Sequence, residues 1–247
     1  MPLAPVPEKI QQISELTNDF HAAGVLGKEI ILEIYRLTRA NKVLHSVETG
    51  SGKSTLLFSA ISTSHKCFTL GSEGNEDAGS LSAVQQSPFF DTTNVEFILG
   101  PTQKTLPGYV FTHPVQLVFI DGPHGYPFPE MEYYFLYQHL AEDGLLILDD
   151  IHIPTIARLN EFLQEESMFT HVGTVQTTSF FRRTAAPLFD PYGDGWWLQN
   201  YNQKRFAKLH AFYVRPNFKH RIYRGLNKLF GEQFAEKVRL FYRGDKV

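Results

Sequence analysis

Residues 47–55 read Val-Glu-Thr-Gly-Ser-Gly-Lys-Ser-Thr, and this stretch decides which fold the chain is expected to adopt. The apolar run at residues 43–47 leads directly into the two glycines, and a helical stretch follows them. The pattern predicts a buried strand, a glycine turn and then a helix. This order is typical of the first unit of an open α/β sheet, in which such a turn lies beside a bound ligand.

Further apolar runs follow the glycine turn, and helical stretches separate them. We predict buried strands at residues 43–47, 65–70, 95–99, 115–120 and 145–148. Consecutive apolar positions are expected where parallel strands are covered on both faces, and the helices between them supply the crossovers. A helix over residues 153–166 and a closing pair of strands, at residues 170–175 and 178–182, complete a predicted α/β, Rossmann-like fold.

Periodicity and charge divide the chain into three parts. Apolar residues between positions 8 and 40 recur at three- and four-residue intervals, which predicts two N-terminal helices broken near residues 24–27. The expected organisation is a pair of helices packing on the core at residues 1–42, a sheet core with helices on both faces at residues 43–184, and an aromatic loop followed by a basic helical tail at residues 185–247.

Composition excludes several classes of protein. Of the 247 residues, 43% are hydrophobic and 20% are charged, which is the profile of a packed chain and not of a disordered one. The lone cysteine, Cys67, excludes a disulfide scaffold and a cysteine-rich metal module, and it fits a reducing compartment, so we expect a cytoplasmic protein. The sequence shows neither an export signal nor a membrane span.

Charge is distributed unevenly along the chain. Residues 201–247 carry 12 Lys and Arg against 3 Asp and Glu, whereas residues 1–200 carry 11 against 23. Apolar positions from Ile222 to Phe241 fall at helical spacing within this basic tail. We favour a cap or a homodimer-forming arm that packs on the acidic body; a nucleic-acid surface and a membrane-surface helix are the alternatives.

The glycine turn is compatible with two kinds of ligand. A phosphate loop needs a glycine five residues before the Gly-Lys-Ser of residues 52–54, but Val47 occupies that position inside the strand. The Gly-Ser-Gly of residues 50–52 instead lets a neutral-headed cofactor approach the backbone, which fits S-adenosylmethionine better than ATP. Glu48 then either accepts hydrogen bonds from a ligand amine or holds the turn. A plain strand-to-helix turn without a ligand is the remaining alternative.

Carboxylates follow two of the later strands. Asp121 comes directly after the fourth predicted strand, and Asp149 and Asp150 come after the fifth. The carboxyl ends of parallel strands line the ligand crevice of an open α/β sheet, so these acids and Glu48 are expected to gather there. Capping of a turn or a helix is the alternative role for each aspartate.

Taken together, these motifs resemble those of the class I S-adenosylmethionine-dependent methyltransferases. They are Glu-Thr-Gly-Ser-Gly at residues 48–52, Asp-Gly-Pro-His-Gly-Tyr at residues 121–126 and Asp-Gly-Leu-Leu-Ile-Leu-Asp-Asp at residues 143–150. The resemblance covers roughly residues 25–184 and is greatest for the catechol-type and macrocin-type O-methyltransferases. It implies a seven-stranded, mostly parallel sheet whose last strand is antiparallel.

The resemblance also implies a role for each motif residue. The cofactor, S-adenosylmethionine, would be bound by Glu48, Thr49, Gly50, Ser51, Gly52, Ser54, Thr55, Glu73, Asp121 and His124. A divalent cation such as Mg²⁺ would be held by Asp121, Asp149 and Asp150, because this ion prefers carboxylate oxygens. Asp149 and His152 would be catalytic, with His152 as the base. The sequence departs from the family after the second strand, where Leu70 stands and Glu73 is the next acid.

Methyl transfer to an oxygen is the activity that these residues predict. A metal-bound hydroxyl loses its proton more readily and a histidine can accept that proton near neutral pH, whereas an amine acceptor needs neither. The expected substrate is a small molecule with a hydroxyl group, such as a sugar, a phenol or another natural product, and the loop at Trp196 and Trp197 is expected to shape its pocket. The alternatives are a nucleic-acid methyltransferase that uses the basic tail, a phosphate-loop nucleotide-binding protein and a non-catalytic binding protein.

Overall fold

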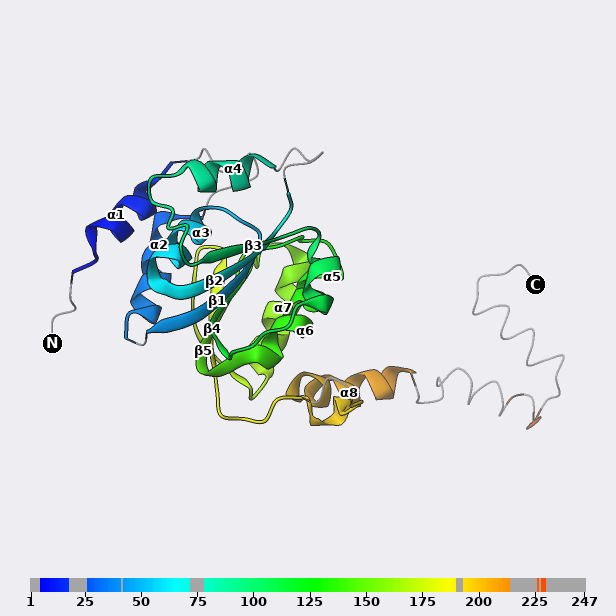
Figure 1. Cartoon of the computed structure of the whole chain (residues 1–247). Helices are drawn as coiled ribbons and strands as arrows, with labels where there is room; N and C mark the ends of the chain where they lie inside the picture. Colours follow the sequence, from blue (N-terminus) through cyan, green and yellow to red (C-terminus); the bar gives the residue numbers. More distant parts are fainter. Residues whose placement is uncertain are drawn as a thin grey trace. The chain divides into compact units, whose positions relative to one another are not determined.

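The computed structural model describes residues 5–17, 26–40, 42–71, 78–189, 193–213, 226 and 228–229 (Figure 1). The chain divides into two compact units, Met1–Asp194 and Gly195–Val247. The first unit holds the whole sheet and all of its covering helices. The predicted sheet core therefore ends about ten residues before the boundary between the units.

A single seven-stranded sheet forms the centre of the first unit. Its strands are β1 (Val43–Thr49), β2 (Ser62–Thr69), β3 (Val95–Leu99), β4 (Val115–Ile120), β5 (Leu140–Leu148), β6 (Phe169–Val175) and β7 (Thr178–Arg183), in the order β3-β2-β1-β4-β5-β7-β6. Strands β1 to β5 are parallel to their neighbours, whereas β7 pairs antiparallel with both β5 and β6. The predicted Rossmann-like sheet with an antiparallel last strand is confirmed.

Helices cover both faces of the sheet (Figure 1). They are α1 (Glu8–Glu15), α2 (Lys28–Thr38), α3 (Lys53–Ile61), α4 (Ala78–Gln86), α5 (Thr102–Thr105), α6 (Phe128–Leu136) and α7 (Pro154–Glu165). Figure 1 shows α1, α2 and α3 on one face and α5, α6 and α7 on the other. The two predicted N-terminal helices thus exist and pack on the core through buried isoleucines such as Ile13 and Ile31.

Two hydrophobic cores result, one on each face, because successive side chains of a strand point to opposite faces. In β4, Leu117 and Phe119 pack with the α1–α3 core, whereas Val118 and Ile120 pack with the α6–α7 core. Strand β5 alternates in the same way between Leu145 and Leu146. The consecutive apolar runs of the sequence are therefore strands buried on both faces, as expected for parallel strands.

Strand β5 begins five residues before the predicted boundary, at Leu140. The polar Glu142 and Asp143 and the glycine at 144 interrupt the apolar pattern there, Asp143 has a φ of +59°, and the register with β4 shifts between Val115 and Leu117. The irregularity hides the start of the strand from a reading based on hydrophobicity. Strand β2 likewise begins at Ser62, whose hydroxyl pairs with Ser46 inside the sheet.

The second unit contains a 3₁₀ turn at Trp196–Leu198 and helix α8 (Asn200–Tyr213). The ring of Trp196 contacts that of Phe206 at 5.0 Å between centroids, which joins the two elements. The apolar positions on which the predicted tail helix rests lie outside the described residues, apart from Leu226 and Leu229. Among the described residues, no helix is both long enough and apolar enough to cross a membrane.

Candidate active site

The glycine turn after β1 needs its first glycine. Gly50 has a φ of +87°, and its N–H donates to the carbonyl of Phe68 at 2.9 Å. A Cβ at this position would lie 2.4 Å from the backbone oxygen of Asp121. Only glycine both tolerates this conformation and leaves that space free. The end of β1 can therefore pack directly against the end of β4.

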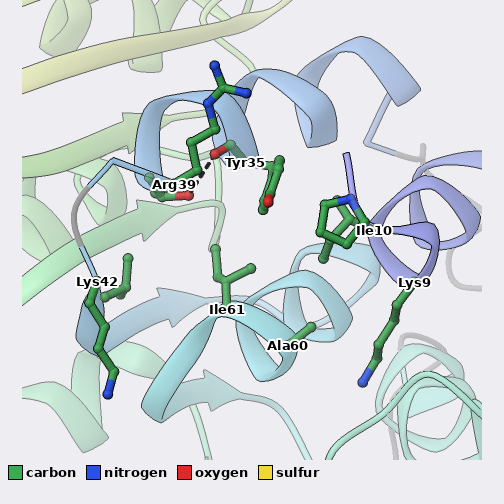
Figure 2. A pocket seen from close by; sticks show the side chains of 10 residues that line it. Lys9, Ile10, Tyr35, Arg39, Lys42, Ala60 and Ile61 are labelled. Atoms are coloured by element: carbon green, nitrogen blue, oxygen red, sulfur yellow. Dashed lines mark hydrogen bonds between the residues drawn. The ribbon is translucent and has the colours of Figure 1, made fainter. Parts of the chain in front are cut away.

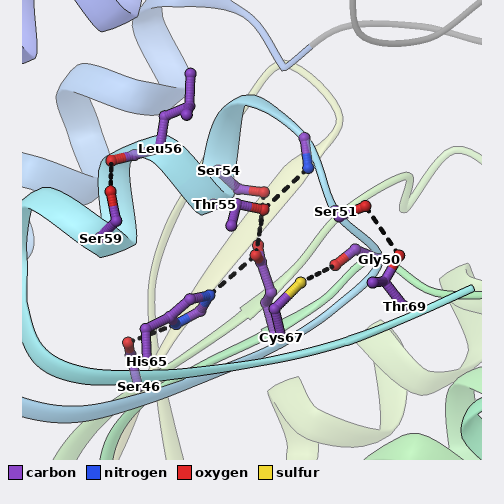
Figure 3. Close-up of polar contacts among 12 residues, drawn as sticks. Ser46, Gly50, Ser51, Ser54, Thr55, Leu56, Ser59, His65, Cys67 and Thr69 are labelled. Carbon is purple, nitrogen blue, oxygen red and sulfur yellow. Dashed lines mark hydrogen bonds and ion pairs between the residues drawn. The ribbon is translucent and has the colours of Figure 1, made fainter. Parts of the chain in front are cut away.

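Glu48 fixes the glycine turn by binding the first turn of the helix that follows it. Its carboxylate is fully buried and accepts hydrogen bonds from Ser54 Oγ at 2.7 Å and Thr55 Oγ1 at 2.5 Å, both in the first turn of α3 (Figure 3). Thr55 Oγ1 in turn accepts the N–H of Gly52 at 3.0 Å. Of the two roles considered for Glu48, the structure therefore places it in the loop-holding one, and it is not among the residues that line the cavity beside the turn.

The network below Glu48 extends into β2. His65 Nε2 lies 3.0 Å from Glu48 Oε1, and His65 Nδ1 lies 2.8 Å from Ser46 Oγ, with every side chain buried (Figure 3). Cys67 Sγ donates to the carbonyl of Gly50 at 3.1 Å, and burial raises the pKa of this thiol well above its usual value. His65 was not singled out from the sequence. The available signal was a polar residue within a predicted buried strand, residues 65–70.

Lys53, the lysine of the Gly-Lys-Ser stretch, makes contacts unlike those of a phosphate-loop lysine. Its Nζ donates to the backbone oxygens of Leu16 at 3.1 Å and Leu26 at 3.2 Å, which lie on either side of the connection between α1 and α2. Burial lowers the pKa of this amine. The side chain thus ties the N-terminal helices to the start of α3.

A cavity of about 840 Å³ lies at the carboxyl ends of the central strands, within the first unit. Five of the predicted site residues line it: Ser51, Asp121, His124, Asp149 and Asp150. Apolar walls come from Leu26, Ile30, Phe68, Leu70 and Phe128. The location agrees with the rule that ligands of open α/β sheets bind outside the carboxyl ends of the strands.

One wall of this cavity carries three hydroxyl groups from separate elements. Ser51 Oγ lies 2.8 Å from Thr69 Oγ1 and 3.2 Å from Ser80 Oγ. Leu70 lines the same cavity directly after Thr69. It follows the second strand, where the family that the sequence resembles usually has an acid. Glu73, the predicted substitute for that acid, lies outside the described residues.

The other wall is acidic. Ligand atoms of Asp121, His124 and Asp150 all lie within 4.8 Å of one another, with His124 Nε2 3.3 Å from Asp150 Oδ2 and 3.6 Å from Asp121 Oδ1. Asp149 Oδ1 accepts a hydrogen bond from Thr178 Oγ1 at 2.5 Å. The structure thus brings the predicted acids together and adds His124, which the sequence had grouped with the cofactor-binding residues.

Crowding shifts the titration of this cluster. Burial, together with the carboxylates of Asp149 and Asp150, raises the pKa of Asp121. Burial also raises the pKa of Asp149, and the carboxylate of Asp121 raises that of His124. Like charges held this closely disfavour one another's ionisation, and a bound cation relieves that repulsion.

His152, the predicted base, lies at the edge of the acidic wall. Its Nδ1 is 3.6 Å from Asp150 Oδ1, and its side chain is 60% exposed. Asp150 itself has a φ of +53°, a conformation that aspartate tolerates better than most residues. Asp150 thus takes up the left-handed conformation at the start of the loop after β5, where its carboxylate lies between His124 and His152.

Glu132 on α6 is a buried acid that the sequence analysis did not single out. It is fully buried beneath the acidic wall and accepts a hydrogen bond from Thr49 Oγ1 at 2.8 Å. Burial raises the pKa of Glu132 to about 7, from the usual 4.5. The signal available in the sequence was an acid on the apolar face of a helix.

This shift predicts a pH-dependent stability. The folded chain binds a proton at Glu132 between about pH 4.5 and 7 whereas the unfolded chain does not, so the free energy of unfolding falls as the pH rises through this window. The loss amounts to roughly 3 kcal/mol, at about 1.4 kcal/mol per pKa unit. Glu132→Gln should lack this slope in denaturant titrations repeated at pH 5, 6, 7 and 8, whereas Glu130→Gln should keep it. A Glu132→Gln curve parallel to that of the wild type would contradict the prediction.

A second cavity lies at the other end of β1. It has a volume of about 390 Å³ and an apolar floor that includes Tyr35 and Ile61, with Lys9, Arg39 and Lys42 around it. Figure 2 shows the Arg39 guanidinium and the Lys42 ammonium pointing to opposite sides, so the cationic groups do not converge on one point. It is separate from the acidic wall and from the glycine turn.

Comparison with known proteins finds a methyltransferase domain in this chain's sequence and the same fold in solved O-methyltransferases. Residues 47–151 match the family described as "Methyltransferase domain". No curated protein matches the chain in sequence.

Several solved structures share the fold. TomG, the Streptomyces achromogenes O-methyltransferase of tomaymycin synthesis, was solved with S-adenosylmethionine; it is 15% identical over 74% of this chain and 93% of its own, with a TM-score of 0.52. The Bacillus cereus O-methyltransferase, in complex with S-adenosylhomocysteine, is 15% identical over the same shares, with a TM-score of 0.53. MycE of the mycinamycin pathway, with Mg and S-adenosylhomocysteine, is 12% identical over 77% of this chain and 58% of its own, with a TM-score of 0.50.

The seven-stranded sheet is the fold shared with these solved O-methyltransferases, and the matched segment is described as a methyltransferase domain. The match to the methyltransferase domain, residues 47–151, runs from the last residues of β1 to the loop after β5. That span contains the glycine turn and all three aspartates of the acidic wall.

Proposed function

We propose that this chain is a divalent-metal-assisted O-methyltransferase that transfers the methyl group of S-adenosylmethionine to a hydroxyl of a small molecule. The observation that carries the proposal is the convergence of Asp121, His124 and Asp150 in the large cavity, whose lining also includes the hydroxyl-bearing Ser51, Thr69 and Ser80. A sugar, a phenol or another natural product is the expected acceptor. A nucleic-acid acceptor is not favoured, because the proposed site lies wholly in the acidic first unit.

The cavity suits S-adenosylmethionine in size and lining. Ligand sites for small molecules typically have volumes of about 300 to 1,000 Å³ with mostly apolar walls and a few polar groups. Here Ser51, next to the glycine turn, lines the cavity together with Thr69 and Ser80, and all three supply hydroxyl groups. The TomG and Bacillus cereus structures contain this cofactor or its product.

The acidic wall suits a hard divalent cation such as Mg²⁺, which prefers carboxylate oxygens and keeps several waters. Asp121, Asp149 and Asp150, which all line the cavity, would hold it, with His124 beside Asp121 and Asp150. Burial is the main cause of the raised pKa of Asp121, and the carboxylates of Asp149 and Asp150 add a repulsion that such a cation would relieve. MycE, a structural relative, binds Mg. A bound cation lowers the pKa of a hydroxyl that it coordinates.

The chain's own residues contribute mainly by positioning. Methyl transfer is an in-line displacement, so the acceptor oxygen, the methyl carbon and the sulfur must be aligned between the two walls. His152 at the rim of the acidic wall would accept the hydroxyl proton. The buried free thiol of Cys67 is consistent with a reducing compartment such as the cytoplasm, and dimer formation through the tail stays a prediction.

Calorimetric titration with S-adenosylhomocysteine, with and without Mg²⁺, tests the cofactor assignment, and an acceptor screen in the presence of Mg²⁺ tests the activity. Asp149→Ala should lower turnover by at least about a hundredfold while changing the Kd for S-adenosylhomocysteine by less than about threefold. Glu96→Ala, which removes an acid paired with Lys66 on the surface of the sheet, is the matched control. Normal turnover in Asp149→Ala would exclude the metal role, and failure of the wild type to bind S-adenosylhomocysteine would exclude the cofactor role.

A further inference from the structure

Resting on this proposed function, we infer that Glu132 is a positioning residue, which fixes the backbone of Asp121 through Thr49 and so sets the geometry of the acidic wall. Glu132 is not itself among the residues that line the cavity, and it reaches the acidic wall through the residues that it contacts. Its effect would be transmitted through one buried hydroxyl group.

The link is a chain of two hydrogen bonds across three elements. Thr49 Oγ1, at the end of β1, donates to Glu132 Oε2 at 2.8 Å and accepts the backbone N–H of Asp121 at 3.1 Å. Thr49 and Glu132 are both fully buried. A threonine hydroxyl has one proton to donate, so with Glu132 as its acceptor its lone pairs face the Asp121 amide.

The other backbone group of Asp121 is held from the opposite side. Its carbonyl oxygen packs against Gly50 so closely that a Cβ there would lie 2.4 Å away. The N–H is therefore fixed by Thr49 and the C=O by the glycine turn. The peptide groups on either side of Asp121 determine where its carboxylate emerges into the cavity.

Glu132 is also packed against the next residue of this loop. A Cβ at Gly122 would lie 2.1 Å from Glu132 Oε1, so the carboxylate takes the space that a side chain would fill. Among the described residues, Oε1 has no hydrogen-bond partner. A buried carboxylate with an unpaired oxygen is unfavourable for stability, and an apolar residue of similar size would avoid that cost. The acid at this position is thus explained by what it orients and not by the stability it adds.

The test compares Glu132→Leu, Glu132→Gln and Thr49→Val with the wild type, with Mn²⁺ as a spectroscopic probe of the metal site. Glu132→Leu and Thr49→Val should weaken Mn²⁺ binding by about 10- to 100-fold, the range for residues that orient metal ligands. Both should also speed hydrogen exchange of the Asp121 amide by at least about tenfold, and in Glu132→Leu the Kd for S-adenosylhomocysteine should change by less than about threefold. Glu132→Gln should restore both readouts to within about threefold of the wild type, because the amide oxygen still accepts from Thr49.

Glu130→Leu, two residues away on α6, is the matched control and should leave Mn²⁺ affinity and Asp121 exchange unchanged. Thr49→Val keeps the inference testable if Glu132→Leu does not fold, since it leaves the side-chain volume almost unchanged. Wild-type Mn²⁺ affinity and Asp121 exchange in the folded variants would overturn the inference. Failure of the wild type to bind S-adenosylhomocysteine would instead overturn the proposed function, and the exchange comparison would still decide the role of Glu132.

Discussion

Replacing Glu48 by alanine is expected to lower the free energy of unfolding by about 3 to 5 kcal/mol, because it leaves several buried polar groups without their acceptor. Ser54, Thr55 and His65 all bond to this one carboxylate. None of them is exposed, so water cannot replace the lost acceptor without entering the core. The same change should release the first turn of α3 and weaken cofactor binding.

Urea denaturation at pH 7 measures this effect directly. Glu48→Gln should be milder, because an amide oxygen in the place of Oε1 still accepts from Thr55 Oγ1 and faces His65 Nε2, and only the contact of Ser54 Oγ with the other oxygen is lost. Glu96→Ala, at a surface ion pair on the neighbouring part of the sheet, should change the free energy of unfolding by less than about 1 kcal/mol. A Glu48→Ala protein as stable as the Glu96→Ala protein would contradict the role of the buried network.

The second large effect is expected for Gly50→Ala. The φ of +87° disfavours any residue with a Cβ by about 1 to 2 kcal/mol, and the added carbon would meet the backbone oxygen of Asp121 at 2.4 Å. The ends of β1 and β4 must then separate, which moves the glycine turn and Asp121 together. We expect binding of S-adenosylhomocysteine to weaken by about a hundredfold, equivalent to about 2.7 kcal/mol.

Gly52→Ala provides the matched comparison for stability. The backbone of Gly52 is extended, and a Cβ there would meet nothing within 4 Å. Its free energy of unfolding should therefore stay within about 0.5 kcal/mol of the wild-type value. If calorimetry and denaturation find Gly50→Ala no more affected than Gly52→Ala, the close packing of β1 on β4 is not what the turn requires.

The sheet could be predicted from the sequence because each central strand is apolar at consecutive positions. Leu117, Val118 and Phe119 must each face one of two buried cores, so no other element accommodates them. The start of β5 escaped prediction because Asp143 and its polar neighbours interrupt that signal. Hydrophobicity reveals where a strand is buried and not where its pairing begins.

The site was only partly predictable for a related reason. Position at the ends of strands brings Asp121, Asp149 and Asp150 to one place, which topology alone ensures. The direction of a side chain depends on its partners, and these are distant in sequence: Glu48 turns inward to His65, and Asp149 bonds to Thr178. Glu132 contacts Thr49 from 83 positions away, a pairing that no local pattern contains.

The network around Glu48 also constrains how the chain can change over time. Ser46, Ser62, His65 and Glu48 are all buried and share hydrogen bonds, so a single replacement leaves a neighbour unpaired. An apolar substitution becomes tolerable only when its partners become apolar as well. Among homologous chains, we therefore expect these four positions to vary together as one unit, with the all-polar and all-apolar combinations common and the mixed ones rare.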